Sequence, residues 1–121
     1  MPPKKYIDDF FNRAEKLVND FFGFVATSCS GSTKWDKRDG KGKHYRVEVK
    51  ATHKGSKSIS LAEFKEWELS AARDRKKLIA VVVFVDESNQ MHINNSFAVV
   101  NTRWLQQMIA RDEENEKTTE V

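Results

Sequence analysis

The run LIAVVVFV at residues 78–85 constrains the fold more than any other part of the sequence. Its residues are all apolar, which is typical of a strand that is covered on both faces. The flanking chain carries helical patterns that can supply this cover. The sequence therefore predicts an α/β fold in which a central mixed β-sheet is flanked by α-helices.

Three helices are predicted around this sheet. Residues 5–22 repeat apolar side chains at helical spacing, and Gly23 is well placed to end that helix. SLAE at 60–63 has the form of a capping box, with Ser60 as the N-cap, and it opens a helix that we expect to reach about Lys76. Thr102 is expected to cap the last helix. The inner stripe of the second helix is predicted to contain Leu61, Phe64, Trp67 or Glu68, and Ala71.

The remaining segments predict strands and loops. Strands are expected at 23–28, 44–52 and 78–85, followed by a hairpin of 91–93 and 97–100, while 29–43 is expected to be a loop or a frayed hairpin. The predicted order is helix, strand, strand, helix, strand, strand, strand, helix. We expect one domain over residues 1–111, followed by an acidic, disordered tail at 112–121.

Composition limits the class of protein. A chain of 121 residues fits one compact domain, and no apolar run approaches the roughly 20 residues that a membrane span requires. The N-terminus lacks the layout of a signal peptide, so we expect a soluble, cytoplasmic protein. Cys29 is the only cysteine, which excludes an intramolecular disulfide and a cysteine-rich zinc site.

Positive charge is concentrated in one part of the chain. From Lys34 to Lys57 there are nine basic residues and three acids, a balance of +6 (9 − 3). Such a segment attracts polyanions by steering and by counterion release, which favours nucleic acid as a partner. The alternative is an ordinary solvated basic loop.

The segment YRVEVKAT at 45–52 combines a strand pattern with charged residues. Its alternation places Val47 and Val49 on one face and Glu48 and Lys50 on the other. Asp39 precedes Glu48 by nine residues and Asp36 precedes it by twelve, so a hairpin would bring carboxylates and a lysine together. Hard oxygen ligands of this kind suit Mg²⁺, and the alternative is a simple salt bridge.

Several motifs occur in one order between Arg13 and about Phe84. They are RAEKLV, SGS, KRDG, VEVKAT, SKSISL and LIAVVVF. In this order the sequence resembles the PD-(D/E)xK nuclease superfamily, and within it the small archaeal and phage-type Holliday junction resolvase-like endonucleases. The resemblance implies a restriction-endonuclease-like core and phosphodiester hydrolysis by an activated water.

The resemblance also implies residue roles. Asp39, Glu48 and Lys50 form the implied catalytic core, with the two acids as ligands of Mg²⁺, for which Mn²⁺ is expected to substitute. Glu15, on the flank of the first helix, is the implied additional metal-linked acid, and Asp36 remains a rival of Asp39 as the first metal ligand. The sequence departs from the phage pattern KGD, because Arg38 stands in place of the glycine and Gly40 in place of the usual apolar residue after the aspartate.

A further set of residues is expected to contact nucleic acid. Most are basic residues of the loop before the Glu-x-Lys strand or of the segment after it, and Trp35 is a candidate for stacking on an exposed base. The full set is Lys34, Trp35, Lys37, Arg38, Lys41, Lys43, His53, Lys54 and Ser58.

The function expected from the sequence is a Mg²⁺-dependent DNA endonuclease. Its substrate is expected to be a Holliday junction or another branched structure, cut by a homodimer, or a strand nicked during phage or mobile-element replication. The alternative is a non-catalytic nucleic-acid-binding module on a nuclease fold. RNA as a substrate stays open, because none of the candidate residues is recognisable as a reader of the 2′-hydroxyl.

Overall fold

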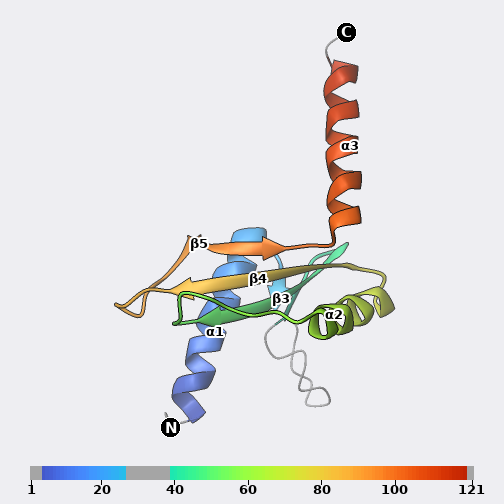
Figure 1. Cartoon of the computed structure of the whole chain (residues 1–121). Coiled ribbons are helices and arrows are strands. Elements are labelled where there is room, and N and C mark those ends of the chain that lie inside the picture. Colours follow the sequence, from blue (N-terminus) through green and yellow to red (C-terminus); the bar gives the residue numbers. More distant parts are fainter. Residues whose placement is uncertain (1–3, 27–38, 120–121) are drawn as a thin grey trace.

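The structure is a computed structural model that describes residues 4–26 and 39–119, with side chains described for residues 10–26 and 40–116. Figure 1 shows a central sheet, with α1 and α2 beside it and α3 projecting away from it. The elements in chain order are α1 (Lys4–Phe22), β1 (Val25–Ala26), β2 (Asp39–Lys41), β3 (Tyr45–Thr52), α2 (Leu61–Arg73), β4 (Lys77–Val85), β5 (Met91–Val99) and α3 (Thr102–Thr119).

The strands form one mixed sheet in the order β1-β2-β3-β4-β5. β3 and β4 are parallel, while the other neighbouring pairs are antiparallel. Parallel strands need a crossover connection, and the loop and helix at 53–76 supply it with α2. The predicted α/β architecture, a central mixed sheet flanked by helices, is therefore confirmed.

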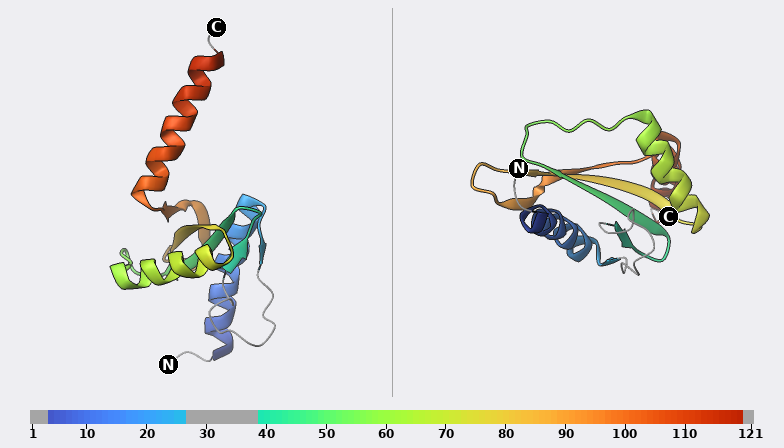
Figure 2. Two further views of the ribbon diagram at one scale, coloured as in Figure 1. Left: turned by 90° about the vertical axis from the view of Figure 1, so that its right-hand side faces the viewer. Right: turned by 90° about the horizontal axis from the view of Figure 1, so that it is seen from below.

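The two faces of the sheet are covered by different helices, as the view along the strands in Figure 2 shows. α1 packs on the face that carries Val47 and Val49 of β3 and Val81 and Val83 of β4, and this side holds the main hydrophobic core. We call it the α1 face, and the opposite face, on which α2 packs, the α2 face. Burying β4 from both sides explains why its sequence is apolar throughout.

Helix ends follow the local signals in the sequence. α1 ends before Gly23, whose φ of 74° lies in the left-handed region that glycine adopts without a steric penalty. The Ser60 side chain accepts a hydrogen bond from the Glu63 backbone N–H at 3.1 Å, so the predicted N-cap of α2 is confirmed. Leu61 lies outside the buried stripe predicted for α2, since it is 72% exposed.

The order of strands differs from the prediction. β2 forms at 39–41 within the segment expected to be a loop or frayed hairpin, and residues 91–99 form one continuous strand in place of the predicted hairpin. The pairing of β5 with β4 is irregular at the polar centre of β5, where the register shifts between Val83 and Val85. The expected turn that would separate two strands at 94–96 is therefore wrong: Met91 and residues 96–99 pair with β4, and residues 92–95 form an irregular, extended stretch between these paired ends.

The last helix also differs from expectation at both ends. Asn101, and not Thr102, provides the cap, because its side-chain oxygen accepts hydrogen bonds from the N–H groups of Arg103 at 2.9 Å and Trp104 at 3.2 Å. α3 then continues to Thr119, so that residues 112–119, for which composition predicted disorder, are helical. No helix in the described part of the chain combines the length and the apolar character that crossing a membrane demands.

Candidate active site on the α2 face

The Glu-x-Lys motif lies in the middle of β3, next to the short strand β2. A tight turn joins the two strands, in which the Gly42 N–H donates to the Tyr45 carbonyl at 2.9 Å. The register then pairs Asp39 with Glu48 and Lys41 with Arg46. Directly opposite positions of an antiparallel pair belong to the same face of the sheet, so position 39 lies on the α2 face with Glu48 and Lys50.

Gly40 allows α1 to approach β2 closely. A Cβ atom at position 40 would overlap the side chain of Asn19 on α1. Asn19 is buried, and neither polar atom of its side chain has a hydrogen-bond partner in the described structure. The departure from the phage motif at position 40 thus coincides with a close helix-strand contact, and β2 forms in spite of the glycine.

Glu48 and Lys50 form an ion pair that is largely withdrawn from solvent. Lys50 Nζ lies 3.2 Å from Glu48 Oε1, and the two side chains are 28% and 12% exposed. The residues are two apart on one strand, so both project from the α2 face. The pair holds the ammonium next to the carboxylate that a metal ion would require.

Trp67 of α2 forms the other side of the lysine environment. Lys50 Nζ lies 5.0 Å from the centroid of the Trp67 ring, within the range of a cation–π contact. The lysine therefore has a carboxylate on one side and an aromatic face on the other. This arrangement limits the rotamers available to Lys50 and orients its Nζ atom.

A second charged cluster continues along β3 beside α2. Arg46 is buried and donates to Ser70 Oγ at 2.9 Å, and its guanidinium lies 3.5 Å from Asp74 Oδ2. Lys41 Nζ lies 3.6 Å from the same carboxylate oxygen. These contacts tie the β2–β3 hairpin to the end of α2 and thereby support the position of Glu48 and Lys50.

Glu15 lies on the other side of the sheet. It is 7% exposed and belongs to α1, which packs on the α1 face, whereas Glu48 and Lys50 are on the α2 face. Glu15 is one helical turn from Asn19, the residue that contacts β2 at Gly40. The α1 helix therefore holds Glu15 on the face of the sheet opposite Glu48 and Lys50, so the structure does not bring these three residues together.

The candidate residues for nucleic-acid contact are distributed over several segments. Lys43 lies exposed in the β2–β3 turn, and Lys54 and Ser58 lie exposed in the segment that follows β3. His53 stacks on Phe10 of α1, with 4.5 Å between the ring centroids. Four of these candidates lie outside the described residues: Lys34, Trp35, Lys37 and Arg38. The rival metal ligand Asp36 also lies outside them, and for Asp39 only the backbone is described.

A metal ion at this site would depend on few ligands. Among the residues whose side chains are described, no group of three or more His, Cys, Asp and Glu residues can hold a metal ion. Two carboxylate positions opposite each other, Asp39 and Glu48, still fit Mg²⁺, because this ion keeps several waters and uses one or two carboxylates together with phosphate oxygens.

Two features of the site were not anticipated from the sequence. Trp67 was predicted to be a core or interface residue, and no local pattern indicates its contact with Lys50. The Arg46 and Asp74 pair was also missed, although the period-2 pattern of β3 already places Arg46 on the same face as Glu48. Contacts between β3 and α2 depend on the crossover geometry, which a single-sequence pattern does not specify.

Comparison with known proteins identified no relative of this chain. No protein-family model, no curated protein and no solved structure matches it. The functional interpretation therefore depends on the geometry of the β2–β3 site.

Proposed function

We propose that the protein is a metal-dependent DNA endonuclease with Asp39, Glu48 and Lys50 at its centre. The observation that carries the proposal is the register of β2 on β3, which pairs Asp39 with Glu48 while Lys50 Nζ lies 3.2 Å from the Glu48 carboxylate. Two carboxylate positions and one ammonium group on one face of a sheet are the set that the resemblance to PD-(D/E)xK nucleases implies. The mixed sheet flanked by helices is compatible with that resemblance.

In this proposal Asp39 and Glu48 would hold Mg²⁺, while Glu15, on the opposite face of the sheet, is not part of the ligand set. When bound, the ion supplies charge stabilisation at the phosphate and lowers the pKa of a water molecule. Lys50 orients the attacking water or offsets negative charge on the phosphoryl oxygens. The ring of Trp67 and the carboxylate of Glu48 keep the ammonium group in place for either role.

The proposed substrate is branched or nicked DNA. Exposed Lys43 and Lys54 lie just before and just after β3, so that a strand lying along β3 would meet positive charge on both sides of Glu48. Resolution of a Holliday junction requires two cuts, so this substrate also implies a homodimer. A nicking function at phage or mobile-element DNA would use the same residues.

The second candidate is a nucleic-acid-binding module without catalysis. It is favoured by the ion pair itself, because Glu48 and Lys50 satisfy each other and such a pair also has a purely structural use. In that case the exposed lysines bind the phosphate backbone, and the carboxylates of β2 and β3 have no chemical role.

A cleavage assay distinguishes the two candidates. Labelled four-way junction, nicked duplex, linear duplex, single-stranded DNA and single-stranded RNA are incubated with Mg²⁺, Mn²⁺ or EDTA. Metal-dependent cutting is expected, with a loss of about 10²-fold or more in Lys50→Ala and Glu48→Gln, while the gel shift of the substrate is retained. Lys65→Ala and Glu87→Gln, at exposed positions elsewhere, are the matched controls.

Intact substrates at high protein concentration, with gel shifts still present, would exclude the nuclease proposal. The binding module predicts a different set of losses. In that case Glu48→Gln leaves binding unchanged, whereas charge reversal at Lys41 and Lys43 abolishes it.

A further inference from the structure

The helix α3 has little support from its own chain. Of its residues with described side chains, only Trp104 is buried and only Met108 is half-buried, and the remainder are exposed. Leu105 and Ile109 are 43% and 49% exposed and lie one turn apart on the same side of the helix. We call Leu105, Met108 and Ile109 the α3 stripe. A helix that projects into solvent in this way, as Figures 1 and 2 show, gains little stability from packing.

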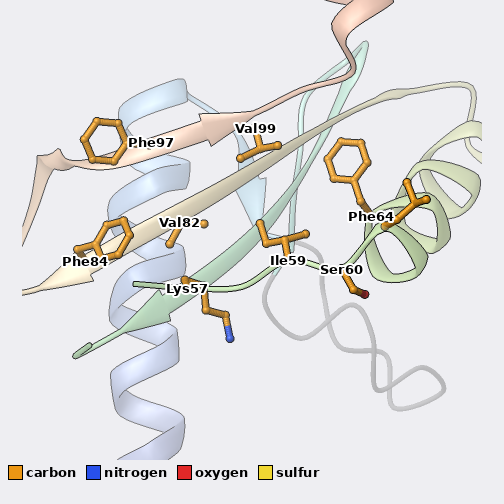
Figure 3. A pocket seen from close by; sticks show the side chains of 9 residues that line it. Lys57, Ile59, Ser60, Phe64, Val82, Phe84, Phe97 and Val99 are labelled. Atoms are coloured by element: carbon orange, nitrogen blue, oxygen red, sulfur yellow. The ribbon is translucent and has the colours of Figure 1, made fainter. Parts of the chain in front are cut away.

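The α2 face of the sheet contains an apolar groove beside β5. Its volume is about 500 Å³, and its lining includes Ile59, Leu61, Phe64, Phe84, Phe97 and Val99. Figure 3 shows the side chains of β4 and β5 on one side of this groove and Ile59 and Phe64 on the other. We call it the Phe97 groove, because Phe97 is 63% exposed there.

We propose that two copies of the chain associate reciprocally, with the α3 stripe of each copy in the Phe97 groove of the other. An amphipathic helix in an apolar groove is a common mode of protein recognition. A reciprocal contact also closes with two-fold symmetry. Of the nine large apolar residues that are exposed in the described structure, five belong to these two surfaces: Leu61, Phe97, Val99, Leu105 and Ile109.

Charge complementarity supports a second copy as the occupant. The α3 stripe is followed by residues 112–116, which contain four acids and no basic residue. The groove is bordered by residues 53–60, which contain two lysines and no acid, and Lys57 lines the groove itself. In a reciprocal dimer the acidic end of each α3 can therefore lie against the basic segment of its partner.

The direction of α3 favours contact between chains. The helix starts after β5 and leads away from the sheet (Figure 1), so most of its length lies apart from the rest of its own chain. The groove lies next to the candidate active site, because Val82 in its lining is the register partner of Lys50. A homodimer is also implied by the proposed Holliday-junction substrate, but the contact between α3 and the groove is tested by association alone and can fail or hold separately from cleavage.

Light scattering of the purified full chain provides the first test. The expected mass is 28.0 kDa, twice the 14.0 kDa of one chain. Leu105→Glu/Ile109→Glu and, separately, Phe97→Lys are expected to raise the dissociation constant by at least about a hundredfold, because apolar contacts at the centre of an interface contribute most to affinity. Leu69→Glu, at a 56% exposed position of α2 outside the groove, is the control and is expected to remain dimeric.

Mixing the two disrupted variants identifies the contact. In the mixture one α3 stripe and one groove are intact and face each other, and the introduced Glu and Lys side chains attract at the other contact. A dimer is therefore expected to form in the mixture although each variant alone is monomeric. Circular dichroism of each variant confirms that the fold is retained. A monomeric wild-type chain, a dimer that survives both variants, or a mixture that stays monomeric would overturn the inference.

Discussion

The ion pair between Lys50 and Glu48 makes a specific prediction about stability. Lys50→Met removes the ammonium group but keeps a long side chain that can pack on Trp67. Glu48 then remains at 12% exposure without its lysine partner. We expect Lys50→Met to destabilise the fold, and the double variant Glu48→Gln/Lys50→Met to recover most of the loss, because it removes both charges.

The magnitude follows from the distance and the burial. At 3.2 Å, with an effective dielectric constant of about 20, the Coulomb attraction is on the order of 5 kcal/mol before desolvation is subtracted. Fully buried pairs lose about 3–5 kcal/mol when one partner is removed, and exposed pairs contribute about 0.2–1 kcal/mol. The burial of the Glu48–Lys50 pair is intermediate between these two cases. We therefore expect Lys50→Met to lower the free energy of unfolding by about 1.5 kcal/mol, which corresponds to a fall of roughly 6 °C in Tm for a domain of this size.

Urea unfolding of the three proteins, followed by tryptophan fluorescence, measures this coupling. Lys16→Met is the control, because Lys16 forms a shorter ion pair with Asp20 at 2.9 Å but both side chains are highly exposed. That variant is expected to change the free energy of unfolding by less than about 0.5 kcal/mol. Equal effects of Lys50→Met and Lys16→Met, or a double variant that is no more stable than Lys50→Met, would refute the reasoning.

Three further predictions concern other contacts of the site and its supports. Gly40→Ala is expected to destabilise the fold by about 1–3 kcal/mol through overlap with Asn19, and Asn19→Ala in the same chain is expected to relieve part of that loss in thermal unfolding. Ser60→Ala removes the α2 cap and is expected to cost about 1 kcal/mol in urea unfolding, whereas a change below about 0.3 kcal/mol would show that the cap contributes little. Trp67→Leu removes the aromatic face beside Lys50 and is expected to slow single-turnover cleavage by about three- to tenfold without weakening DNA binding, so unchanged cleavage would exclude a role in orienting the lysine.

Features that depend on local periodicity and capping could be predicted from the sequence. The alternation in β3 placed Val47 and Val49 on one face and Glu48 and Lys50 on the other, and the structure confirms this assignment. Ser60 was identified as a cap and Gly23 as a helix end from their intrinsic backbone and side-chain preferences. Each of these features involves residues within a few positions of one another, so the sequence contains the necessary information.

Features that depend on which segments meet could not be predicted in the same way. Residues 91–99 form one strand because both of its ends pair with β4, and the central Asn residues, which favour a turn, lie in the irregular stretch between them. The register that pairs Asp39 with Glu48 and the contact of Trp67 with Lys50 both arise from the packing of hairpin, sheet and crossover helix. The sequence by itself thus determined the faces of the individual elements, whereas only the tertiary structure decided their partners, because pairing energy depends on long-range contacts that no local pattern records.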